Sequence, residues 1–111
     1  MSETIIANSH SIAVRNDYLR SFLPMMPNPH KLILSAHVSQ LTRGEMFEII
    51  SLVKRFTNFT NENDPYKERD FGRVVFCDEV FLWKFDYFDE SFTSFQENGI
   101  RALTIMHESE Y

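Results

Sequence analysis

The spacing of apolar residues predicts a helix and then a strand in the first third of the chain. Over 11–23, apolar residues share one face of a helix until Pro24, which cannot continue it. Apolar and polar residues then alternate over 31–38, as is typical of a strand with one buried face. On the first helix, we expect the polar face to meet water at Arg15, Asn16, Asp17 and Arg20.

A capping box marks the start of the next helix. Thr42 is followed three residues later by Glu45, a pair whose side chains satisfy each other's backbone N–H groups at a helix N-terminus. A helix over 43–56 is therefore predicted, and its apolar residues keep the helical period. We expect it to contact the core through Met46, Ile49, Ile50, Val53 and Phe56.

A long polar loop and a hairpin follow this helix. Residues 57–71 are rich in Asn, Asp and Glu, and irregular loops of this length in compact domains are often functional. Two β-rich runs, 72–76 and 80–88, flank a short turn at 77–79, which predicts a β-hairpin. One face of the second run is wholly aromatic, with Phe81, Trp83, Phe85 and Tyr87, and we expect most of this face to be core.

The C-terminal segment carries a second capping box, from Ser94 to Glu97, which predicts a last helix with Ile100, Leu103 and Met106 on one side. The pattern as a whole indicates an α+β fold, with a small antiparallel β-sheet of about three strands packed against amphipathic helices. The predicted order is α-β-α-β-β-α. Because 111 residues suit one domain, we expect a single globular domain over 11–111, preceded by a flexible arm at 1–10.

The composition narrows the possible partners. The chain has 11 Lys and Arg against 16 Asp and Glu, a net charge of −5, which is the wrong sign for a protein that binds nucleic acid through its phosphates. No apolar run approaches the roughly 20 residues of a membrane span, and one unpaired cysteine fits a reducing compartment. We therefore expect a cytoplasmic protein that binds neither nucleic acid directly nor a membrane.

The acidic loop admits two interpretations. Its carboxylates, together with Asp86 of the predicted hairpin, offer the oxygen ligands that Mg²⁺ or Mn²⁺ prefers, so Asp64, Asp70 and Asp86 are the candidate set for a metal-dependent nuclease or hydrolase. However, the restriction-nuclease pattern needs a carboxylate two residues before Lys84, and Leu82 stands there. The structural interpretation is that Asp64 and Asp70 bind backbone amides and shape the loop, while Arg69, Arg73 and Lys84 neutralise them.

Other catalytic chemistry has little support. The four histidines are scattered without the spacing of a zinc site, and Cys77 lies in an acidic turn that disfavours a thiolate. We therefore expect no catalytic residue, metal or cofactor, although the alternative of an enzyme with the acidic loop stays open.

Exposed aromatic residues indicate an interaction surface instead. Tyr66, Tyr87, Phe88 and Phe92 are expected outside the core, and Tyr66 with Arg69 combines two residue types enriched at interface hot spots. The interaction candidates are Asp64, Tyr66, Glu68, Arg69, Asp70, Lys84, Asp86 and Asp89.

Three ordered segments resemble a known family. They are Asn63-Asp64-Pro65-Tyr66 with Glu68 and Asp70-Phe71-Gly72, then 81–89, then 101–106 with a Glu110-Tyr111 ending. Over about Ile12 to Tyr111 the chain is similar to the bacterial domain of unknown function DUF3768. Many members of that family have His where this chain has Arg69. The segment 90–96 is also shorter than the usual insert.

The leading hypothesis is a small acidic protein-interaction module without catalysis. One form that such a module takes is an inhibitor carried by a phage or plasmid against a bacterial defence complex, of the anti-CRISPR or antirestriction type. Its partner would be a basic nucleic-acid-binding protein complex, bound by charge complementarity. The alternative is the metal-dependent nuclease or hydrolase of the acidic loop.

Overall fold

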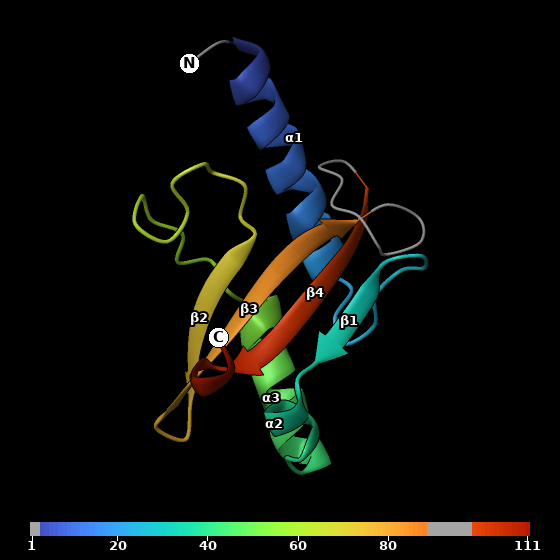
Figure 1. The fold of residues 1–111 in the computed structure, drawn as a ribbon, viewed down its shortest axis with the longest axis vertical. Coiled ribbons are helices and arrows are strands. Elements are labelled where there is room, and N and C mark those ends of the chain that lie inside the picture. Colours follow the sequence, from blue (N-terminus) through green and yellow to red (C-terminus); the bar gives the residue numbers. More distant parts are fainter. Residues whose placement is uncertain (1–2, 89–98) are drawn as a thin grey trace.

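A four-stranded sheet with helices on one face forms the centre of the computed structural model, which describes residues 3–88 and 99–111 (Figure 1). The helices are α1 (Glu3–Arg20), α2 (Ala36–Ser39) and α3 (Arg43–Lys54), and a 3₁₀ turn η1 (Glu108–Glu110) ends the chain. The strands are β1 (Lys31–Leu34), β2 (Phe71–Phe76), β3 (Glu79–Phe88) and β4 (Ile100–His107).

The sheet has the strand order β1-β4-β3-β2. β1 runs parallel to β4, whereas β4–β3 and β3–β2 are antiparallel pairs. In Figure 1, α1 and α3 lie behind this sheet, and α2 lies below it. The α+β class is confirmed, but the sheet has four strands and is mixed, so the expectation of about three antiparallel strands is wrong in detail.

Residues 100–107 form the strand β4 where a helix was predicted, and the short elements α2 and η1 are additional, so the predicted order α-β-α-β-β-α is wrong at these points. β4 lies between β1 and β3, and side chains on both of its faces are buried, including Ala102, Leu103, Ile105 and Met106. A short apolar run of this kind fits a helical period by coincidence, because a strand buried on both faces does not alternate. The capping box at Ser94 lies outside the described residues.

Two boundaries also differ from the prediction. β1 ends at Leu34 because the hydroxyl of Ser35 accepts a hydrogen bond from the Val38 amide and starts α2. The strand predicted over 31–38 therefore covers only 31–34. α1 begins at Glu3, earlier than the predicted start at residue 11. Its first turns project beyond the sheet in Figure 1, where a helix needs no apolar stripe.

The other local predictions are confirmed. Thr42 and Glu45 form the capping box that starts α3, with reciprocal backbone hydrogen bonds of 3.0 and 3.2 Å. The β2–β3 hairpin turns at Cys77 and Asp78, whose φ angles of 52° and 62° match the two-residue turn that suits the twist of a hairpin.

The aromatic face of β3 forms the middle of the core. Phe81 and Trp83 are fully buried, and Phe85 and Tyr87 are nearly so. The apolar side of α3 packs on the same cluster through Ile49, Ile50 and Val53, as predicted. α1 contributes Ile12, Leu19 and Leu23.

Gly72 permits the close approach of β2 to the Trp83 ring. The two residues are cross-strand partners, and a Cβ built on Gly72 would lie 2.2 Å from the indole Nε1. Trp83 has no room to move, because the rings of Phe56, Phe59 and Phe85 surround it at centroid distances of 5.6, 6.1 and 6.1 Å. Glycine is therefore required here for space.

We expect Gly72→Ala to destabilise the protein by roughly 1–3 kcal/mol, the usual cost of overpacking a core. Chemical denaturation followed by the fluorescence of Trp83, the single tryptophan, measures the change. The matched control is Gly44→Ala in the first turn of α3, where a Cβ meets nothing within 4 Å and is expected to be neutral or slightly stabilising. Equal stabilities for the Gly72 variant and the wild type would contradict the close approach.

Candidate functional site

Two polar residues of α1 face the core instead of water. Asn16 is fully buried and Arg20 is 5% exposed, and they continue the buried stripe of Ile12, Leu19 and Leu23. The expectation that both belong to the solvent face is therefore wrong, whereas Arg15 is exposed as predicted. The helical spacing was the correct signal, and the polar character of the two residues concealed it.

Asn16 joins three separate parts of the chain. Its Nδ2 donates to the Tyr87 hydroxyl at 2.9 Å and to the Glu68 carbonyl at 3.0 Å. Its Oδ1 accepts from Nε of the buried Arg101 at 2.7 Å, and the Arg101 guanidinium lies 4.9 Å from the centre of the Tyr87 ring. The amide is thus bonded at both ends, which is what a buried polar group requires.

Arg20 connects α1 to the end of α3 and to the aromatic cluster. Its Nη1 donates to the carbonyls of Val53 and Lys54 at 2.6 and 3.3 Å, which satisfies acceptors at the α3 C-terminus. The guanidinium also lies 4.9 Å from the Trp83 ring and 5.5 Å from the Phe59 ring. A positive charge over aromatic faces near a helix C-terminus is favourable for both reasons.

The loop over 57–70, which we call the anchored loop, is fixed from inside by Asp64. Asp64 is 6% exposed, and its Oδ1 accepts from the backbone amides of Glu68 and Arg69, both at 3.0 Å. The prediction that this carboxylate shapes the loop is confirmed. Lys67 and Arg69 have φ angles of 58° and 54°, an unfavourable region for such side chains that the surrounding bonds maintain.

The anchored loop is also attached to α1 and to β3. Arg69 pairs with Asp17 of α1 at 2.5 Å, and its guanidinium lies 5.4 Å from the Phe59 ring. The Asp70 carbonyl accepts from the Phe85 amide at 2.8 Å, which continues the β2–β3 ladder into the loop. The loop is therefore attached to other elements near its start, through Phe59, and at its end, through Glu68, Arg69 and Asp70.

The charges of this region are paired differently from the prediction. Arg69 binds Asp17, Arg73 lies 4.0 Å from Glu108, and Lys84 binds Asp86 at 3.1 Å, so none of the three has Asp64 or Asp70 as its salt-bridge partner. Burial raises the pKa of Asp70, whose Oδ2 accepts from the Tyr87 hydroxyl at 3.4 Å. Burial also raises the pKa of Tyr87.

The candidate metal ligands of the acidic loop do not meet. Asp70 contacts Tyr87 on the helix-covered face of the sheet, whereas Asp86 alternates with Tyr87 along β3 and pairs with Lys84 on the opposite face. One carboxylate oxygen of Asp64 already accepts hydrogen bonds from two backbone amides. Asp64, Asp70 and Asp86 therefore form no common site, and Asp89 lies outside the described residues.

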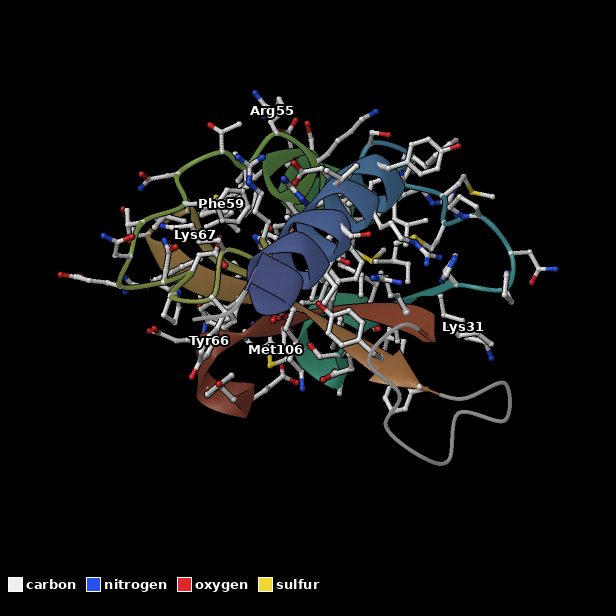
Figure 2. All side chains as sticks on the ribbon, turned by 90° about the horizontal axis from the view of Figure 1, so that it is seen from above. Lys31, Arg55, Phe59, Tyr66, Lys67 and Met106 are labelled. Carbon is white, nitrogen blue, oxygen red and sulfur yellow. The ribbon has the colours of Figure 1, made fainter. Side chains whose placement is uncertain are left out.

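Of the aromatic residues expected at the surface, Tyr66 is strongly exposed. Its side chain is 71% exposed on the anchored loop, and Figure 2 shows it on the same flank of α1 as Phe59 and Lys67. Tyr87 is buried at 5% because its hydroxyl finds partners inside, so its assignment to the surface is wrong. Phe88 is half-buried, and Phe92 lies outside the described residues.

A second exposed surface is an apolar groove of about 400 Å³ between the α1–β1 connection, β1 and α3. Met25 and Phe47 on its edges are 74% and 51% exposed, and Arg43 supplies a charge. Most of the remaining lining is aliphatic or methionine: Leu32, Leu34, Met46 and Ile50.

The fold also brings together three potential metal ligands that the sequence shows as scattered. His37, Glu79 and His107 each place one ligand atom within 4.8 Å of the other two. They come from α2, the start of β3 and the end of β4, so no local spacing reveals them. The parallel pairing of β1 with β4, which the sequence did not predict, places His37 beside His107.

Comparison with protein families gives a match over most of the chain. A family model described as "Protein of unknown function (DUF3768)" matches residues 34–110. The chain belongs to the DUF3768 family. The DUF3768 match begins at Leu34, the last residue of β1, and ends in η1, so it includes the anchored loop and the three potential metal ligands, whereas α1 precedes it. Comparison with curated proteins and with solved structures found no match. Within the described part of this DUF3768 chain, no helix has the length and apolar character needed to cross a membrane.

The raised pKa of Asp70 predicts how stability depends on pH. The native state holds this proton more tightly than the unfolded chain, so stability falls as pH rises from the ordinary aspartate range through the raised native pKa. We expect Asp70→Asn to remove this fall, which makes the variant the more stable protein at neutral pH and nearly equal to the wild type in acid. Urea midpoints across the acid and neutral range measure the difference. A wild type that is more stable than Asp70→Asn at neutral pH would contradict the raised pKa of Asp70.

Proposed function

We propose that this chain is a cytoplasmic protein-interaction module without catalysis, and that the anchored loop is its recognition element. The observation that carries the proposal is the contrast within the loop: Asp64 and Glu68 are bonded inward, while Tyr66 between them is 71% exposed. An exposed tyrosine on a fixed loop is typical of binding surfaces, since little entropy is lost when it meets a partner.

The backbone of the loop supports the same proposal. Lys67 and Arg69, one and three residues after Tyr66, adopt left-handed conformations that cost free energy, and both side chains are exposed. A loop that served only to connect α3 with β2 would not need this geometry. Local strain held by surrounding hydrogen bonds is frequent where a loop must present a side chain in one orientation.

The net charge of −5 favours a basic protein as the partner. On the loop, Glu62 is exposed and available for such a contact, whereas Asp64 and Asp70 have inward hydrogen bonds. Charge reversal at Asp64 or Asp70 would therefore change the loop itself. Glu62 and Tyr66 are the positions that test recognition without removing the internal bonds.

In its finer form, the proposal is that the partner is a bacterial defence complex, whose nucleic-acid channel supplies the basic surface. The support is the small size and acidic charge of the chain. Asp64, Asp70 and Asp86 form no common site, so the metal-dependent nuclease or hydrolase is not proposed.

We expect Tyr66→Ala to weaken partner binding while leaving thermal stability unchanged, because the side chain is exposed. The wild type, immobilised and incubated with extract from a bacterium carrying defence systems, should retain a specific protein that elutes at raised salt. Loss of an interface hot spot should reduce retention by at least about tenfold. Phage plating tests whether the partner is a defence complex. If the chain inhibits defence, phage should form more plaques on cells that express the wild type than on cells that express Tyr66→Ala.

Two matched variants locate the surface. Tyr18→Ala removes another exposed tyrosine, on α1, and Phe47→Ala removes an aromatic side chain from the apolar groove. We expect both to retain the partner. If Tyr66→Ala retains the partner and Phe47→Ala does not, the binding surface is the apolar groove and not the anchored loop. Equal retention of the partner by all variants would contradict the proposal.

A further inference from the structure

The two histidines that the fold brings together are stacked. The rings of His37 and His107 lie 4.2 Å apart between centroids and are inclined by 11°. The fully buried Phe81 contacts both rings edge-on, at 6.1 and 5.3 Å, and forms an apolar floor beneath them. Glu79, which is exposed, closes one side, with its Oε1 3.2 Å from Nε2 of His107.

The C-terminal turn fixes the backbone of both histidines. One carboxylate oxygen of Glu110 accepts from the His107 amide at 2.9 Å and from the Ser35 hydroxyl at 2.6 Å, and the other accepts from the His37 amide at 3.2 Å. Three chain segments are thereby joined next to the imidazoles.

Nδ1 of His107 faces the C-terminal turn. It accepts a hydrogen bond from the Ser109 amide at 3.1 Å, and the Ser109 hydroxyl lies 2.8 Å from it. The ring proton is therefore on Nε2, where it faces Oε1 of Glu79 at 3.2 Å. A zinc ion at Nε2 displaces this proton to Nδ1, from which it can be donated to the Ser109 hydroxyl, and a hydrogen bond on the second ring nitrogen is the usual support of a metal-bound histidine.

Two imidazoles and one carboxylate form a ligand set for a first-row transition ion. Zinc binds such groups at about 2.0–2.1 Å, with ligand atoms about 3.3 Å apart in tetrahedral geometry. The three atoms lie within 4.8 Å of one another. Binding of one ion therefore requires the exposed Glu79 side chain to rotate and the His37 ring to turn out of its parallel stack with His107. The solvent side leaves a fourth position for water.

We propose that His37, Glu79 and His107 bind one zinc ion at the end of the sheet, with Ser109 and Glu110 as the residues that position the ligands. The ion ties α2, the β2–β3 hairpin and the C-terminal turn together. This site lies apart from the anchored loop, so it stands independently of the proposed function.

The test is a zinc titration of the untagged protein, freed of metal, in competition with a chromophoric chelator. We expect one equivalent to bind with a dissociation constant of about 1 µM or lower, and to raise the thermal unfolding midpoint. Cobalt should give the visible absorption of a four-coordinate nitrogen and oxygen site. His107→Ala and His37→Ala should each weaken binding by at least about tenfold.

Because the histidine variants also remove ring packing on Phe81, the decisive pair is Glu79→Gln and Glu108→Gln. Both residues are exposed acids at the same end of the sheet and both changes remove one negative charge, but Glu108 contacts Arg73 and not the histidines. We expect weaker zinc binding only for Glu79→Gln. Absence of binding by the wild type at about 100 µM zinc, or equal affinity in the two glutamine variants, would overturn the proposal.

Discussion

The position of α1 depends on one buried amide. Asn16 has no exposed surface, and its three hydrogen bonds reach the loop before β2, the end of β3 and the start of β4. A shift of the helix by one residue would bury Asp17 or Arg15 in its place and leave the Arg101 guanidinium without this acceptor. Since an unsatisfied buried polar group costs about 1–3 kcal/mol, and more when it is charged, the network favours one register of α1.

The shape of the anchored loop follows from that register. Three residues of α1 contact the loop. Asn16 contacts Glu68, Asp17 contacts Arg69, and Arg20 contacts Phe59. The loop therefore has partners outside itself at three points, besides the internal bonds of Asp64. In this arrangement the polar face of one helix determines how Tyr66 is presented, even though Tyr66 itself contributes little to stability.

Local signals in the sequence predicted the parts of the fold that depend on neighbouring residues. The Thr42 capping box, the turn at Cys77 and the alternation through Trp83 each need only a few adjacent positions. The strand at 100–107 was predicted as a helix because its burial comes from β1 and β3, which are distant in sequence. For the same reason Asn16 was assigned to the surface, and His37 and His107 were not connected. The exposure of Tyr66 was predicted, since polar neighbours surround it in the chain.

Hydrogen exchange in Asn16→Ala tests most directly whether α1 holds the anchored loop in place. The amides to follow are those of Glu68 and Arg69, which donate to Asp64, with amides of the β2–β3 hairpin as the internal reference and Tyr18→Ala as the control on the same helix. We expect the loop amides of Asn16→Ala to exchange faster relative to the hairpin, because the contact with Glu68 is lost and α1 is loosened. Unchanged protection of Glu68 and Arg69, with faster exchange confined to α1, would show that the loop is fixed by Asp64 alone.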